Sequence, residues 1–240
     1  MEENRGAAMN VFAIGDLHLA GSMDKTMDMF GDQWEGHWDK IRSDWKVRVR
    51  QADLVLLPGD ISWAMRLEEA REDLLQLADL PGTIVMIKGN HDFWWSSLAK
   101  LRAALPPGIL PLQNQAYGFD GFVVCGTRGW ICPSDGALPP QDEKIYMREI
   151  ARLELSLKAG ARLLEEGGGR IIAMMHFPPF NERQEESGFV RLFREYGVEK
   201  VVYGHLHGRS LATAFEGDLQ GTEYIQVSCD HLGFRLKQIC

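Results

Sequence analysis

Five of the seven histidines lie in short polar segments, two of which also carry an aspartate or an asparagine, and a further segment carries an aspartate alone. Each segment closely follows an apolar run of strand length. Carboxylate, carboxamide and imidazole groups at the ends of neighbouring strands are the ligands that borderline-hard metal ions require. A buried core has little other use for so many polar groups, because each must find a partner or cost free energy. The segments are Asp16-Leu17-His18, Gly59-Asp60, Gly89-Asn90-His91-Asp92, His176 and Gly204-His205-Leu206-His207.

Short apolar runs predict the strands that position these segments. Several runs lack polar alternation, as expected for strands that are covered on both faces. Active sites of such sheets lie beyond the carboxyl ends of the strands, which is where the polar segments fall. The predicted strands are Val11–Ile14, Leu54–Leu57, Ile84–Ile87, Val123–Cys125, Ile171–Met175 and Val201–Tyr203.

Three stretches between the strands have helical periodicity. The first covers roughly residues 32–50 and places three tryptophans on one face, which we interpret as core packing. Asp32 and Glu35 at its start resemble a capping box. The other two predicted helices cover residues 67–79 and about 142–166, and Gly167-Gly168-Gly169 ends the last of them.

This alternation of strands and helices predicts an α/β fold with a mostly two-sided sheet layered with helices. Asp120-Gly121 predicts a β-hairpin, and the tail from Leu211 is expected to form short strands broken at Glu216-Gly217-Asp218. No internal repeat or interdomain linker is evident. We therefore predict a single domain over residues 9–240, preceded by a polar extension of residues 1–8.

Composition limits the class of protein. A hydrophobic content of 45% and a charged content of 25% are ordinary for a soluble globular protein of 240 residues. The net charge of −8 argues against non-specific binding of nucleic acid, which relies on basic surface. It does not exclude an anionic substrate, because a pair of metal ions can invert the local field.

Compartment and cysteine chemistry follow from the same composition. The N-terminal residues are polar and contain no apolar signal segment, and no apolar run approaches the ~18 residues of a membrane span. The four cysteines show no CxxC spacing, so we expect free thiols in a reducing compartment and no sulfur-ligated zinc. We predict a cytoplasmic protein that does not bind membranes.

In their order, the polar segments resemble the full signature of the calcineurin-like metallophosphoesterases, over about residues 10–208. The Gly-Asn-His-Asp and Gly-His-x-His strings are each specific, and all five segments in order make coincidence a poor explanation. The closer resemblance is to bacterial phosphohydrolases of undefined substrate. It implies a four-layer α-β-β-α sandwich, in which two packed mixed β-sheets are flanked by helices.

The resemblance also implies a dinuclear metal site. A bridging carboxylate holds two cations about 3.5–4 Å apart, a spacing at which they share a hydroxide that attacks the phosphoryl group. Oxygen and imidazole ligands without thiolate suit two divalent or mixed-valence ions of manganese, iron or zinc. The implied ligands are Asp16, His18 and His207 for one ion, Asn90, His176 and His205 for the other, and Asp60 as the bridge.

His91 is not a ligand in the family pattern. Its implied role is to protonate the leaving oxygen or to neutralise charge on it, with Asp92 orienting the imidazole ring. The alternative is a hydrogen-bonded histidine in a turn. Purple acid phosphatases carry a tyrosine ligand three residues after the bridging aspartate, and Trp63 stands there in this chain. Because indole cannot act as an anionic oxygen ligand, a tyrosinate-bound ferric ion is not expected.

The segment 126–140 is a candidate substrate-binding loop, since it follows a predicted strand and is long and rich in Gly and Pro. Arg128 could bind a phosphate through two hydrogen bonds, and Trp130 could stack on an aromatic group. An equally weighted alternative is a surface loop whose arginine pairs with a carboxylate. The Phe93-Trp94-Trp95 run is a candidate pocket wall or part of the core, and His37 and His231 match no motif.

These observations favour a metal-dependent phosphohydrolase that cleaves a phosphomonoester or phosphodiester. Its substrate is expected to be a small molecule or a nucleotide. A nuclease or nucleotide phosphodiesterase of the same fold is an alternative, although the sequence shows no basic groove. A second alternative, from another class, is a protein-binding scaffold without catalysis. The sequence leaves the substrate, the native metals and the oligomeric state open.

Overall fold

The strands are apolar on both faces because each β-sheet is covered on both sides. The computed structural model describes residues 8–21, 27, 31–134 and 138–240. In β2 (Leu54–Leu57), Leu54 and Leu56 pack between the two sheets, whereas Val55 and Leu57 pack under helices. This two-sided burial explains why the apolar runs show no polar alternation.

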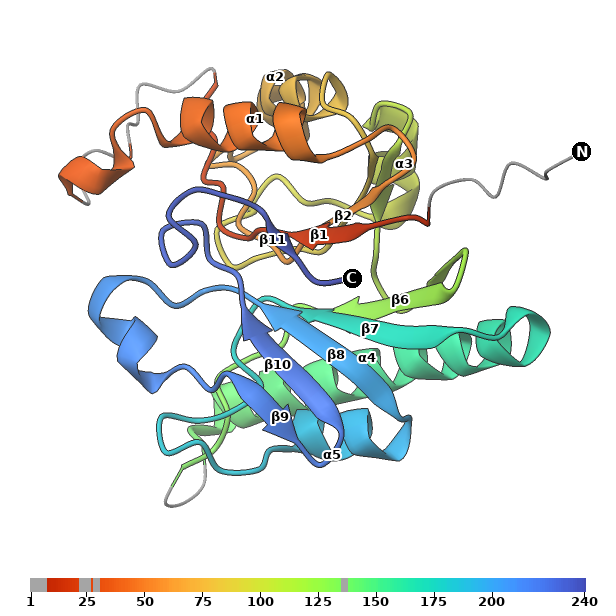
Figure 1. Cartoon of the computed structure of the whole chain (residues 1–240). Coiled ribbons are helices and arrows are strands. Elements are labelled where there is room, and N and C mark those ends of the chain that lie inside the picture. The colour runs from red at the N-terminus through yellow and green to blue at the C-terminus, as the bar shows by residue number, and fades with distance from the viewer. Residues whose placement is uncertain (1–7, 22–26, 28–30, 135–137) are drawn as a thin grey trace, which may run out of the picture.

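Two mixed sheets stack face to face (Figure 1). The first sheet is parallel except for one antiparallel edge strand, and the second is parallel except for an antiparallel strand at each edge. The first sheet has the order β11 (Lys237–Gln238), β1 (Val11–Ala13), β2, β3 (Thr83–Met86) and β4 (Ile109–Pro111). The second has the order β5 (Tyr117–Phe119), β6 (Phe122–Thr127), β7 (Arg170–Met175), β8 (Val198–Tyr203), β10 (Thr222–Gln226) and β9 (Gly217–Leu219).

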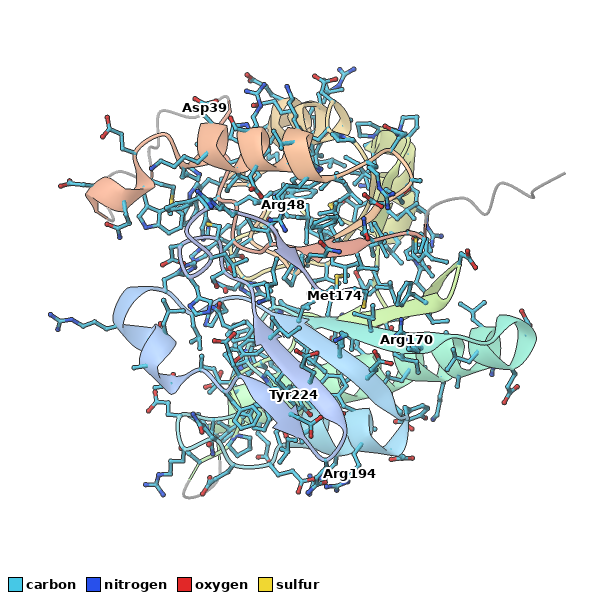
Figure 2. The ribbon with its side chains drawn as sticks, in the orientation of Figure 1. Asp39, Arg48, Arg170, Met174, Arg194 and Tyr224 are labelled. Carbon is cyan, nitrogen blue, oxygen red and sulfur yellow. The ribbon has the colours of Figure 1, made fainter. Side chains whose placement is uncertain are left out.

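Helices cover the outer face of each sheet, which completes four layers (Figure 1). Three hydrophobic clusters fill the spaces between the layers, one under each helical layer and one between the sheets. Figure 2 shows Met174 inside, between the sheets, and Asp39 and Arg194 on the outside. The predicted α-β-β-α sandwich is therefore confirmed. The first sheet carries α1 (His37–Arg48), α2 (Leu67–Ala78) and α3 (Leu98–Ala104), and the second carries α4 (Pro140–Gly167) and α5 (Gly188–Glu195).

The first helix begins later than its periodicity predicts. Residues 32–34 form a separate 3-10 helix, η2 (Asp32–Trp34), and α1 begins only at His37. Gly36 lies between them with φ 59° and provides no side-chain cap, so the predicted capping box of Asp32 and Glu35 is wrong. A glycine in the left-handed region interrupts the helical path between the two segments.

The C-terminal tail also differs from expectation. The predicted break at Glu216-Gly217-Asp218 is wrong, because Gly217 begins β9 and the chain turns at Gln220-Gly221 instead. The 3-10 helix η3 (Gly208–Thr213) precedes this hairpin. The predicted hairpin at Asp120-Gly121 is confirmed, since it joins β5 to β6 in antiparallel register.

The described residues contain no membrane-spanning helix and no disulfide bond. Within those residues, no helix is both long and apolar enough to cross a bilayer. All four cysteines are free thiols, and three of them are buried. Residues 1–7 of the predicted N-terminal extension lie outside the described residues.

Candidate metal centre

The seven predicted ligands come directly after five strands that end at the same edge of the sandwich. Asp16 and His18 follow β1, Asp60 follows β2 and Asn90 follows β3. His176 follows β7, and the pair His205 and His207 follows β8. β1, β2 and β3 run parallel to one another, as do β7 and β8, so their carboxyl ends bring these side chains together.

One group of ligands consists of Asp16, His18 and His207. One ligand atom from each residue lies within 4.8 Å of the others. The Nε2 atom of His207 is 3.6 Å from Oδ1 of Asp16. Carboxylate and imidazole at this spacing can share one cation, as the sequence predicts for the first ion.

The second group consists of Asn90, His176 and His205. Oδ1 of Asn90 is 2.6 Å from Nε2 of His176 and 2.9 Å from Nδ1 of His205. The two imidazole nitrogens are themselves 3.2 Å apart. Three ligand atoms therefore converge on one point.

Asp60 lies between the two groups. Its Oδ2 atom is 3.8 Å from Nε2 of His18 and 3.6 Å from Nε2 of His176. Its other oxygen, Oδ1, accepts a hydrogen bond of 2.8 Å from the backbone N–H of His91. A carboxylate oriented in this way is in position to contact a cation in either group.

The short contact between His176 and Asn90 in the second group cannot be an ordinary hydrogen bond, because no proton is available between the two atoms. Nδ1 of His176 is 3.0 Å from the carbonyl oxygen of Pro58, so this nitrogen must carry the proton and donate it. Nε2 then presents a lone pair toward Oδ1 of Asn90, which is also an acceptor, at 2.6 Å. Burial lowers the pKa of His176, so a second proton on the ring is disfavoured. A cation between the two atoms would relieve this repulsion, and the donor set fits a metal ion.

The other imidazoles are also held in the form that binds metal. Burial lowers the pKa of His18 and of His205 to about 3, so both rings are neutral. Within the described residues, Nδ1 of His18 is buried and has no hydrogen-bond partner. His207 differs: burial lowers its pKa, but its contacts with Asp16 and Asp230 outweigh burial and raise that pKa to about 10.

The pKa values of the two aspartates Asp60 and Asp16 are shifted in opposite directions. Burial, followed by the charges of Asp92 and Asp16, raises the pKa of Asp60 to about 9. For Asp16 burial acts in the same direction, but the neighbouring His207, His176 and His18 outweigh it and hold its pKa below the usual range. Cations that bind here would replace the proton on Asp60, so binding is expected to be linked to proton release.

Four of the predicted ligands have left-handed backbone conformations. The φ angles are 58° for Asp16, 47° for His18, 52° for Asp60 and 75° for His205. For residues other than glycine this region costs roughly 1–2 kcal/mol each. Such strain persists only where the surrounding structure imposes it, and it concentrates at functional sites.

Comparison with known proteins agrees with this geometry. The family model of the calcineurin-like phosphoesterases matches residues 9–209. The chain belongs to this family. A search of curated proteins found no match.

Solved structures with the same fold share little sequence with this family member. A phosphopantetheinyl hydrolase from Mycobacterium tuberculosis is similar with a TM-score of 0.56 at 14% identity, covering 98% of this chain and 96% of that one. TT1561 of Thermus thermophilus matches with a TM-score of 0.50 at 14% identity, covering 97% and 98%. AQ665 from Aquifex aeolicus, a protein of unknown function, matches with a TM-score of 0.50 at 12% identity, covering 96% of each chain. At these identities the similarity shows the fold alone.

Sequence reasoning missed two residues that hold predicted ligands of this calcineurin-like phosphoesterase in place. Asp230 Oδ1 is 2.8 Å from Nδ1 of His207, which leaves Nε2 of that ring free to face a metal ion. Ser228 donates a hydrogen bond of 2.8 Å to Oδ2 of Asp16. A signal for them exists: Ser228-Cys229-Asp230 is a polar segment after the apolar end of β10, like the five segments that sequence reasoning selected.

His91 and Asp92 lie beside the ligands in different settings. The His91 ring is half-buried, with its centroid 4.6 Å from Trp63 and 5.7 Å from His18. The Asp92 carboxylate is fully buried and accepts five hydrogen bonds, from the backbone N–H groups of residues 60, 61, 62 and 89 and from Nε1 of Trp94. These bonds fix the loops that carry Asp60 and Asn90. That Asp92 orients the His91 ring stays a prediction.

Arg128 and Trp130 form a stacked pair beside the ligands. The guanidinium of Arg128 lies 4.7 Å from the ring centroid of Trp130, and its Nη2 is 3.7 Å from Oε1 of Glu149. Nε1 of Trp130 donates to Asp142 at 3.1 Å. The arginine therefore pairs with a carboxylate, and substrate binding by this pair stays a prediction. Residues 135–137 of the predicted loop lie outside the described residues.

The remaining aromatic and histidine residues fall into distinct roles. Trp63 stacks on the ring of His18 at 4.6 Å, so the residue in the tyrosine position packs on a ligand. In the Phe93–Trp95 run, Trp94 and Trp95 belong to the core and Phe93 is exposed. Nε2 of His37 lies 2.9 Å from the carbonyl oxygen of Leu17, and His231 pairs with Glu216 at 3.2 Å.

Gly89 provides a steric test of the site. A Cβ atom at Gly89 would lie 2.0 Å from Oδ1 and 2.2 Å from the backbone N of Asp60. Gly89→Ala is therefore expected to displace Asp60, to lower the bound metal content and to cost about 1–3 kcal/mol of stability. Elemental analysis and thermal unfolding measure the two effects.

Gly118 is the matched control for this substitution. A Cβ atom there meets only Cδ1 of Leu163, at 3.8 Å. Gly118→Ala should leave the metal content unchanged. Full metal content in Gly89→Ala would contradict the assignment of Asp60 to the metal centre.

Proposed function

We propose that the chain is a dinuclear metallophosphoesterase that hydrolyses a phosphomonoester or phosphodiester. The observation that carries this proposal is the position of Asp60, with one oxygen within 3.8 Å of His18 and within 3.6 Å of His176. Asp16, His18 and His207 would hold one ion, and Asn90, His176 and His205 the other. When bound, two such ions supply a nucleophilic hydroxide at neutral pH and stabilise charge on the phosphoryl oxygens.

The protein's own residues would hold the substrate and move one proton. A cavity of about 310 Å³ opens next to the ligands, and its wall includes Trp34, Trp63 and His91. A leaving group in this cavity would lie beside His91, which we assign to protonation of the leaving oxygen. Apolar walls exclude water and favour a leaving group with an apolar or aromatic part.

The test is metal content and activity measured on the same preparation. We expect roughly two ions of manganese, iron or zinc per chain. We also expect hydrolysis of at least one class among monoesters, diesters, nucleotides and short nucleic acids, lost on chelation and restored by metal. Hydrolysis that continues in chelated, metal-free protein would overturn the proposal.

The same screen separates the alternative functions. A preference for nucleic acid that falls steeply with salt would favour a nuclease. Two bound ions without hydrolysis of any substrate in the screen would favour a binding scaffold. The half-buried position of His91 next to Trp63 and His18 favours catalysis over a scaffold, since binding alone does not use it.

A further inference from the structure

A second cavity, of about 230 Å³, opens where β3, β4 and β6 end and α4 passes beside them. We call it the cationic cavity, because four of its lining residues carry a positive charge. Only one acidic side chain, Glu149, is among its lining residues. The polar and charged residues in its wall are Lys88, Gln113, Asn114, Thr127, Arg128, Arg148, Glu149 and Arg152.

Glu149 arranges the arginines around this cavity. The carboxylate is fully buried, and its Oε1 lies 2.8 Å from Arg152, 3.3 Å from Arg148 and 3.7 Å from Arg128. Its other oxygen accepts a hydrogen bond of 2.8 Å from Thr127 Oγ1. One carboxylate against four cations leaves three positive charges uncompensated in the cavity wall, in a chain whose net charge is −8.

Hydrogen-bond donors in the cavity wall are also unused. Nε of Arg128 is buried and has no partner among the described residues. Across residues 8–21, 27, 31–134 and 138–240, the ammonium of Lys88 makes no hydrogen bond or ion pair. Like charges held close together with free donors are arranged to receive an anion.

The cationic cavity adjoins the metal centre. Lys88 is two residues before the ligand Asn90, and the carbonyl oxygen of Arg128 accepts a hydrogen bond of 3.1 Å from the backbone N–H of His176. The cavity and the predicted metal centre are therefore neighbours in the fold.

We propose that the cationic cavity binds a second phosphate group of the substrate, while the phosphoester to be cleaved lies at the metal centre. This inference rests on the proposed function, and it narrows the substrate to organic phosphates that carry a further phosphate. Three uncompensated positive charges match a dianion better than a single carboxylate, and guanidinium groups bind phosphate through paired hydrogen bonds.

Arg148→Gln and Lys88→Gln are the test variants. The Arg148 side chain is 51% exposed. When Arg148 is replaced, the Glu149 carboxylate still has Arg128, Arg152 and Thr127 as partners. Lys88 forms no ion pair with Glu149, so the buried carboxylate keeps all its partners in that variant. Arg162→Gln, an exposed site on the same helix α4, is the control with an equal loss of charge.

The first measurement is binding of inorganic phosphate to the full-length chain by calorimetry, in an Asp60→Asn background that weakens the metal centre. Each test variant should weaken binding about 10-fold, as expected for loss of a charged hydrogen bond, and Arg162→Gln should not. Binding that both test variants leave unchanged, or that Arg162→Gln weakens equally, would overturn the proposal.

The second measurement compares alkanediol bisphosphates of increasing length with the corresponding monophosphates. In the metal-loaded wild type, kcat/KM should be about 10-fold higher for a bisphosphate of suitable length, mainly through a lower KM. This preference should disappear in the test variants and remain in Arg162→Gln. Equal preference in all four chains would overturn the proposal. Variant-sensitive phosphate binding without any hydrolysis would contradict the proposed function and leave the cavity as an anion site.

Discussion

Asp60→Asn is expected to abolish phosphoester hydrolysis and to lower the metal content below two ions per chain. A neutral carboxamide lacks the anionic oxygen that Asp60 would present between the two groups of proposed ligands. Losing this charge stabilisation is worth several kcal/mol, which corresponds to a rate loss of about 10³-fold or more. Metal analysis and kinetics with the best substrate from the screen measure both effects.

The fold of this variant should be intact, and the pH dependence of stability shows why. Burial and the charges of Asp92 and Asp16 raise the pKa of Asp60 to about 9 in the metal-free chain. Metal-free wild type therefore loses stability as the pH rises from the ordinary aspartate range toward 9, because the folded state keeps a proton that the unfolded state releases. Asparagine has no such charge. The metal-free variant should unfold at an equal or higher temperature at neutral pH.

Asp39→Asn is the control for Asp60→Asn. Its side chain is 84% exposed on α1, on the outside of the molecule (Figure 2). This control should keep metal, activity and stability. If Asp60→Asn retained two ions and full activity, the bridging assignment would be wrong.

His91→Ala is expected to keep both metal ions and to slow hydrolysis by ~10²–10⁴, the usual contribution of general acid catalysis. Nitrophenolate leaving groups need less protonation, so the rate of hydrolysis of such substrates should fall less in this variant. The backbone N–H of residue 91 still bonds Asp60 in the alanine variant, so the ligand geometry should survive. Leaving-group series and metal analysis on wild type and variant give the two readouts.

His231→Ala is the control for this experiment, since His231 pairs with Glu216 and is not among the proposed ligands. It should leave the rate unchanged. Equal losses on good and poor leaving groups would point to positioning or charge neutralisation by His91. Loss of metal from His91→Ala would show that His91 is a ligand or supports one.

The sequence allowed the strands to be predicted well, because they depend on short-range patterns. That the polar segments at their ends bind metal stays a prediction. β2 has the predicted bounds, since Leu54–Leu57 is apolar on both faces and Pro58-Gly59 ends the run. The predicted ligands lie at strand ends, where the backbone leaves the sheet and polar groups from several strands can meet. That the chain from residue 9 to 240 forms one domain stays a prediction.

Other features depend on contacts that local patterns do not reveal. α5 is only eight residues long, and its start depends on Ser187, whose hydroxyl accepts hydrogen bonds from the backbone N–H groups of Phe189 and Val190. Helix periodicity is weak over so short a span. The bonds of Asp92 reach residues about 30 positions earlier, and Asp230 meets His207 only after β10 has paired. Such long-range partners are set by tertiary packing.

The separation of the ligands along the chain also governs when metal can enter. Asp16 accepts hydrogen bonds from the backbone N–H of His205, 189 positions later, so the centre joins segments that are far apart in the sequence. A nascent chain whose synthesis has not yet passed β8 lacks both His205 and His207. Metal loading must then follow synthesis and docking of the two sheets, which is slow for contacts of such long range. We therefore expect the folded protein to select its ions by ligand geometry and by which metals are available in its surroundings at that moment.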